Sequence, residues 1–121
     1  MSSEERPSKS RERARHAVES IDAIRDYLAE HSRDSYSGDR KTQSATEREL
    51  LIVSEAVARL LDLDPELQVD FPSVPWPQIR GLGNRLRHEY EKVDVAIVWE
   101  TVSASGDLDL LRDALAKRYL S

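Results

Sequence analysis

The sequence predicts an all-α protein, an up-and-down bundle of four to five helices. Apolar residues recur every three or four positions along almost the whole chain, which is the spacing of one helix face. No segment shows the apolar–polar alternation of a half-buried strand. All but one of the five prolines fall within residues 64–77, and we expect this stretch to be extended or turn-like.

Two helices are predicted before the prolines. The first covers about residues 10–33, and its apolar stripe consists of Ala14, Ala17, Ile21, Ile24 and Leu28. Residues 34–45 are small and polar and are interpreted as a loop. Thr46 and Glu49 have the spacing of a capping box. A second helix is therefore expected from about residue 46 to Leu63.

Three further helical segments are predicted after the prolines. A helix over about residues 77–91 opens on a proline, which suits a first turn. Asp94 is expected to cap a helix over about residues 95–104. Gly106 marks a break, and apolar residues at helical spacing outline a last helix over residues 108–120.

The composition narrows the possible functions. The chain has 121 residues, and its 18 basic and 23 acidic residues give a net charge of −5. Such a protein is not expected to coat nucleic acid non-specifically, although a local basic groove remains possible. Cysteine is absent, so no disulfide or thiolate chemistry is expected. We expect a single domain over residues 1–121, flexible at about 1–9, cytoplasmic and without a membrane span or secretory signal.

The stretch GLGNRLRHEY at residues 81–90 carries the candidate site. Asn84 and His88 are an i,i+4 pair, so the amide and the imidazole are neighbours on one helix face. Arg80 and Arg85 add positive charge near this pair. A surface histidine flanked by charges is more often simply solvated than catalytic. On spacing alone, a solvated surface and a catalytic site both stay open as interpretations of His88. No metal-ligand spacing accompanies His88.

Residues 74–102, VPWPQIRGLGNRLRHEYEKVDVAIVWETV, resemble the HepT toxins of the HEPN superfamily. The family motif is Trp-x-x-Ile-x-Gly-x-Arg-Asn-x-x-x-His-x-Tyr, followed closely by Val-Asp. The positions in register with it, together with one tryptophan further on, are Trp76, Ile79, Gly81, Asn84, His88, Tyr90, Val93, Asp94 and Trp99. The resemblance implies a HEPN-like helical bundle that forms a homodimer.

The resemblance also implies a metal-independent endoribonuclease that needs no cofactor and cleaves tRNA or mRNA. His88 would act as the acid or base, supported by Asn84. A groove between two facing protomers would gather Arg80, Arg85 and Arg87 against RNA phosphates. The partner would be an MntA-like nucleotidyltransferase antitoxin.

In this family the antitoxin can adenylylate the motif tyrosine, here Tyr90, and so silence the toxin. Helical spacing alone favours a core role, because Tyr90 falls in line with Ile79 and Leu86. A hydroxyl at the rim of a core tyrosine is compatible with both roles.

The motif departs from the family at one position, where Gly83 stands in place of arginine. Loss of such a charge partner typically costs on the order of 10²–10³-fold in rate. Three explanations are open: a degenerate toxin, a substitute in Arg80 or Arg85, or a substitution that detoxifies the protein. A different class of function is also open, namely a non-catalytic RNA- or protein-binding module that retains the fold. Gly81 belongs to the family pattern, where close packing or backbone approach would offset its cost of about 1 kcal/mol in a helix interior.

Overall fold

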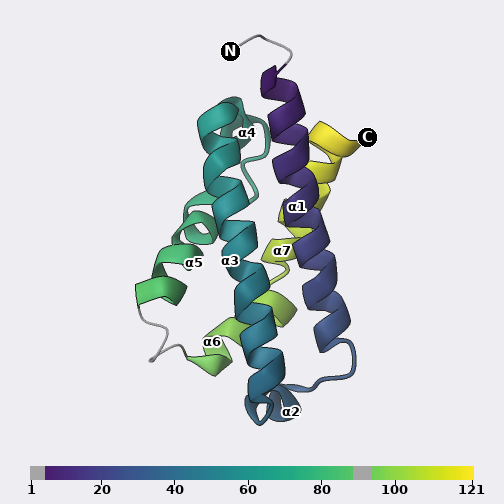
Figure 1. The fold of residues 1–121 in the computed structure, drawn as a ribbon, viewed down its shortest axis with the longest axis vertical. Helices are drawn as coiled ribbons and strands as arrows, with labels where there is room; N and C mark the ends of the chain where they lie inside the picture. The colour runs from purple at the N-terminus through teal and green to yellow at the C-terminus, as the bar shows by residue number, and fades with distance from the viewer. Residues whose placement is uncertain (1–4, 89–93) are drawn as a thin grey trace.

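The computed structural model describes residues 5–88 and 94–121 of the chain, and within these ranges all regular structure is helical (Figure 1). The predicted all-α bundle is therefore confirmed. None of the helices in this described part of the chain combines the length and apolar character needed to cross a membrane.

Two long helices form the centre of the bundle. Helix α1 (Glu5–Leu28) and helix α3 (Arg40–Leu63) lie side by side and run in opposite directions (Figure 1). The predicted apolar stripe of α1 is buried in the core, since Ala14, Ala17 and Ile21 have no exposed surface. It packs against Leu50, Val53, Val57 and Leu60 of α3 and against the C-terminal helices.

The connection between α1 and α3 differs from the prediction. Helix α1 runs over Glu5–Leu28 rather than 10–33, and the expected loop at 34–45 contains a short helix, α2 (Arg33–Ser37). Ser32 caps α2, because its side chain and that of Ser35 each accept a backbone N–H from the other residue.

The predicted start of the second helix is wrong. Helix α3 begins at Arg40, and Asp39 caps it by accepting the Thr42 backbone N–H at 3.1 Å. Thr46 has no exposed surface and lies inside the helix rather than at its end. The capping-box spacing of Thr46 and Glu49 is therefore a coincidence of sequence.

The proline-rich stretch is not extended throughout. It contains helix α4 (Glu66–Asp70), and helix α5 (Trp76–His88) begins inside its C-terminal end. The Trp76 indole N–H donates to the Phe71 carbonyl at 2.9 Å, and the ring is 2% exposed. This buried ring fixes the turn from which α5 starts. The predicted last turn of the third helix, at 89–91, lies outside the described residues.

The C-terminal helices follow the prediction closely. Helix α6 (Val95–Trp99) continues into a π-helical turn, η2 (Glu100–Ala104), and the Asp94 carboxylate caps α6 through the Ala96 N–H at 2.8 Å. Gly106 has a φ of 75°, a left-handed conformation that favours glycine. Beyond it run α7 (Asp107–Leu115) and a second π-helical turn, η3 (Ala116–Leu120).

An ionic cluster ties the C-terminal segment to the end of α3. Arg118 donates two hydrogen bonds of 3.0 Å to the Asp64 carboxylate, and the Tyr119 hydroxyl donates a third at 2.6 Å. Partial burial opposes ionisation of Asp64, but these hydrogen bonds outweigh it and hold the pKa of the carboxyl below its usual value. Burial raises the pKa of Tyr119, and its hydrogen bond to the Asp64 carboxylate raises it further.

Helix α3 packs against α1 and also against α5, which lies along the edge of the bundle (Figure 1). This arrangement leaves one face of α5 directed away from the core. The predicted site therefore lies on an outer helix, supported by the most central one.

Candidate functional site

Helix α5 has a buried face and an exposed face, as the apolar spacing predicts. Ile79, Leu82 and Leu86 are each at most 7% exposed, whereas Arg80, Asn84 and Arg85 are exposed. The polar strip of the motif is therefore accessible along the part of α5 for which side chains are described.

The Ser54 hydroxyl of α3 makes two hydrogen bonds to the backbone of α5, one as acceptor and one as donor. Its Oγ accepts the Gly83 N–H at 2.8 Å and donates to the Arg80 carbonyl at 2.9 Å. Ser54 is 2% exposed, and Gly83 is also buried. Position 83 therefore lies within the interface between α3 and α5, and its backbone is fixed there.

A groove of about 230 Å³ opens beside this contact, between α3 and α5. Its α5 wall contains three residues of the predicted site, Arg80, Gly83 and Asn84. Its α3 wall carries charged residues that the sequence analysis did not select, Glu55, Arg59 and Asp62. An Arg80 Nη2 and an Asp62 Oδ1 are 3.8 Å apart across the groove.

The α3 residues of the groove were missed because their own segment contains only a weak indication of a site. All three lie before Trp76, where the motif begins, and only the packing of α3 on α5 brings them to it. Their i, i+4 and i+7 spacing, at Glu55, Arg59 and Asp62, was the available signal, since it places three charges on one helix face. That pattern is also typical of an ordinary solvated face.

Arg85 does not share this groove. It lines a second pocket of about 400 Å³ with Gly81, Thr101 and Asp107, on the other side of Asn84. Asn84 borders both spaces. A Cβ added to Gly81 would meet no atom within 4 Å, so packing among the described residues does not explain the glycine at this position.

The structure describes the remaining motif residues only in part. Arg87 and His88 are placed by their positions in the last turn of α5. Helix geometry sets His88 about 6 Å along the axis from Asn84 and about 40° around it. Tyr90 and Val93 lie outside the described residues.

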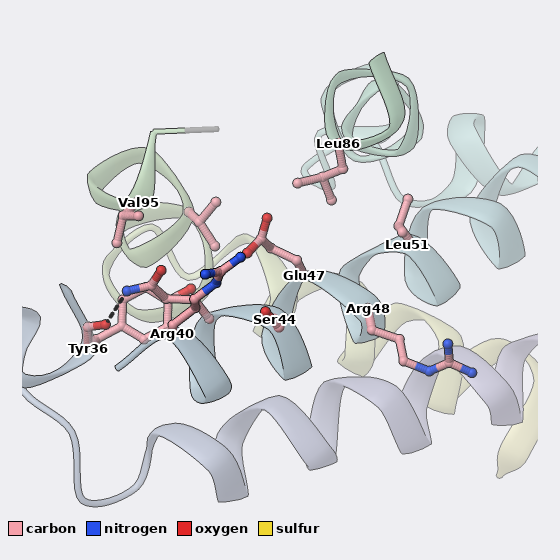
Figure 2. A pocket seen from close by; sticks show the side chains of 10 residues that line it. Tyr36, Arg40, Ser44, Glu47, Arg48, Leu51, Leu86 and Val95 are labelled. Atoms are coloured by element: carbon pink, nitrogen blue, oxygen red, sulfur yellow. Dashed lines mark hydrogen bonds between the residues drawn. The ribbon is translucent and has the colours of Figure 1, made fainter. Parts of the chain in front are cut away.

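A larger cavity, of about 550 Å³, lies between α2, α3, α5 and α6 (Figure 2). Leu51, Leu86 and Val95 form apolar walls, and Arg40 and Glu47 also line the cavity. Burial raises the pKa of the Glu47 carboxyl. Among the predicted site residues whose side chains the structure describes, which are Arg80, Gly83, Asn84 and Arg85, none lines this cavity. We therefore take the groove beside Gly83 as the candidate site.

The fold and the groove define a small all-helical protein with a polar site between two helices, and sequence comparisons assign it to a family. Residues 17–120 match the family model described as "Ribonuclease HepT-like". The chain belongs to this HepT-like family.

Two curated relatives illustrate the similarity. The "Probable ribonuclease HepT" of Thermococcus cleftensis is 31% identical over 100 residues, which cover 78% of this chain and 88% of that protein. The "Putative RNase MJ0127" of Methanocaldococcus jannaschii is 33% identical over 86 residues, covering 70% of this chain and 68% of that protein. No solved structure matches the chain.

The Ser54 contact predicts a specific effect of mutation. In Ser54→Ala the Gly83 N–H and the Arg80 carbonyl lose a buried partner, and we expect the free energy of unfolding to fall by about 1–2 kcal/mol. Hydrogen exchange at the Gly83 amide should also accelerate. Chemical denaturation and exchange measured by NMR would test both effects. The control is Ser44→Ala, an exposed serine of the same helix. Equal stability and equal exchange in the two variants would contradict the assigned contact.

Proposed function

We propose that this protein is the toxin of a bacterial toxin–antitoxin module and an endoribonuclease whose activity is weakened by Gly83. The observation that carries the proposal is the position of Gly83 and Asn84 in one exposed groove of a HepT-like chain. His88 follows Asn84 by one helical turn. The names of the curated relatives, which refer to ribonucleases, support the same activity.

The chemistry requires little beyond proton transfer and charge stabilisation. The 2′-hydroxyl oxygen of RNA attacks the adjacent phosphorus and gives up its proton to a base. The 5′-oxygen then leaves with a proton from an acid. An imidazole can both accept and donate a proton, and His88 would serve in either role. The proposal needs no metal or cofactor for these steps.

The phosphorus centre gathers negative charge during the attack, and a guanidinium stabilises that charge through two hydrogen bonds. Position 83 supplies none. In this proposal His88 and Asn84 keep the proton-transfer part of the site, while charge stabilisation is reduced.

Residues 83 and 88 point about 140° apart on a straight helix. One protomer alone does not account for a joint site. We therefore include a homodimer in the proposal, with the α5 helices of two protomers facing one RNA. Arg80, Arg85 and Arg87 of both copies would line the RNA-binding surface, despite the net charge of −5.

A non-catalytic RNA- or protein-binding module is the second candidate, and Gly83 is the observation that favours it. Such a module would retain the groove and its charges without cleaving RNA. The two candidates differ in whether restoring the guanidinium restores cleavage.

Gly83→Arg is expected to increase RNA cleavage by on the order of 10²–10³-fold. His88→Ala in the same background should abolish it. Initial rates on a labelled single-stranded RNA, together with growth arrest on expression, would measure the effect. Gly81→Arg is a matched control, because it adds the same charge to α5 at a position with open space for a side chain.

Folding of each variant is checked by circular dichroism, because position 83 is buried. If folded Gly83→Arg cleaves no more RNA than Gly81→Arg, the ribonuclease proposal is wrong and the binding module is favoured.

Tyr90 is proposed as the residue that a nucleotidyltransferase antitoxin adenylylates. Added nucleotide phosphate close to His88 would exclude RNA by charge and bulk. Co-expression with that partner should increase the intact mass by whole AMP units, and Tyr90→Phe should remove the increase. Neutralisation of the toxin with no change in mass would instead indicate inhibition by binding alone.

A further inference from the structure

The groove beside Gly83 contains a guanidinium that the motif does not provide. We infer that Arg59, on the α3 wall, binds the RNA phosphate that position 83 leaves without a guanidinium. This inference rests on the proposed ribonuclease function. Arg59 lies outside the HepT-like motif of residues 76–90, on a helix that carries none of the motif residues. Its guanidinium would replace the one that is missing at position 83.

The two walls of the groove run in opposite directions. Ser54 of α3 contacts Gly83, whereas Asp62, two turns further along α3, faces Arg80, which precedes Gly83 on α5. Arg59 lies five residues after Ser54, or about 7.5 Å along the axis of α3. Arg59 also points about 140° around α3 from Ser54, but both residues line the groove, and the axial offset from Gly83 is one that an arginine side chain can span.

The direction of the side chains distinguishes Arg59 from Arg80. Each Cα–Cβ bond in a helix tilts toward the N-terminus of that helix. For Arg59 this direction leads back along α3 toward the level of Ser54 and Gly83. For Arg80 it leads up α5, away from Gly83 and from His88.

The ion pairs also distinguish Arg59 from Arg80. Arg80 has Asp62 at 3.8 Å, so part of its charge is already balanced. Arg59 is exposed and has no carboxylate within 4.0 Å among the residues that the structure describes. Glu55 precedes it by one turn, which is the spacing of a helical ion pair. Arg59 is thus the arginine of this groove that is available to an anion.

Arg85 is excluded by its position. It lies in the neighbouring pocket with Asp107, beyond Asn84. A guanidinium in that pocket does not share the space beside Gly83. Of the two substitutes that the sequence suggested, Arg80 and Arg85, neither meets both conditions of position and direction.

The test measures binding of a short single-stranded RNA carrying 2′-fluoro groups, which the protein cannot cleave through a 2′-hydroxyl. Fluorescence anisotropy gives the Kd at several salt concentrations. Arg59→Ala should weaken binding about tenfold at low salt, and the slope of log K against log salt should decrease by about 1. Arg59→Lys keeps the charge but loses the paired donors, so an intermediate loss is expected.

Arg48→Ala is the matched control. Arg48 is an exposed arginine of the same helix, and it lies three turns before Arg59 on nearly the same face. Its removal changes the net charge equally, and we expect less than a twofold effect. Glu55→Gln should strengthen binding about twofold, because it removes a negative charge close to the bound phosphate.

A double-mutant cycle with Gly83→Arg completes the test. If both guanidinium groups serve the same phosphate, Arg59→Ala should cost much less in the Gly83→Arg background than in the wild type. Equal effects of Arg59→Ala and Arg48→Ala in a protein that binds RNA would overturn the inference and leave the proposed function intact. Absence of RNA binding and cleavage in both the wild type and Gly83→Arg would overturn both.

Discussion

The arrangement of the candidate site depends on the contact between the Ser54 hydroxyl and the backbone of α5. This contact joins the central helix α3 to the outer helix α5 at Gly83 and Arg80. It determines which residues of α5 face α3 and which remain exposed. The groove, with Asn84 on one wall and Arg59 on the other, exists because the two helices meet in this register. A buried hydroxyl that is satisfied on both sides is a strong constraint, since an unmade hydrogen bond at such a place is costly.

The proposed anion-binding site is compatible with the acidic character of the whole protein. The net charge of −5 describes the whole surface, whereas an RNA phosphate responds to charges within about one Debye length, roughly 10 Å at 0.1 M salt. The groove contains two arginines and two carboxylates, and Asp62 is 3.8 Å from Arg80. The balance at Gly83 is therefore set by Arg59 and Glu55, two residues one turn apart on α3.

Much of the fold is predictable from helical spacing, and the exceptions have physical causes. The stripe of α1 and the segment from Asp94 to Ala104 follow local rules of apolar periodicity and capping. The start of α3 was not predictable from these rules. Residues 40–45 form the first, mostly polar turns of the helix, and their composition resembles that of a loop. Helices α2 and α4 are five residues long. Such short helices are stabilised by caps and tertiary contacts rather than by periodicity.

The candidate site is likewise predictable in part from the sequence and depends in part on tertiary packing. The sequence of α5 was sufficient to select Asn84, His88 and the replacement at Gly83. It was not sufficient to find Arg59, because that residue becomes part of the site only through the packing of α3 against α5. Arg80 and Arg85 point about 140° apart on the helix, but which pocket each of them lines depends on the packing of the neighbouring helices.

The central claim is that RNA binds in the groove between α3 and α5 beside Gly83. The most direct measurement is an NMR titration of the isotopically labelled protein with 2′-fluoro RNA, following backbone amides, arginine Nε–H groups and the Asn84 side-chain amide. The account predicts that the largest shifts occur at Gly83, Asn84 and Arg59. Shifts concentrated instead around Arg40, Glu47 and Val95, in the larger cavity of Figure 2, would contradict it.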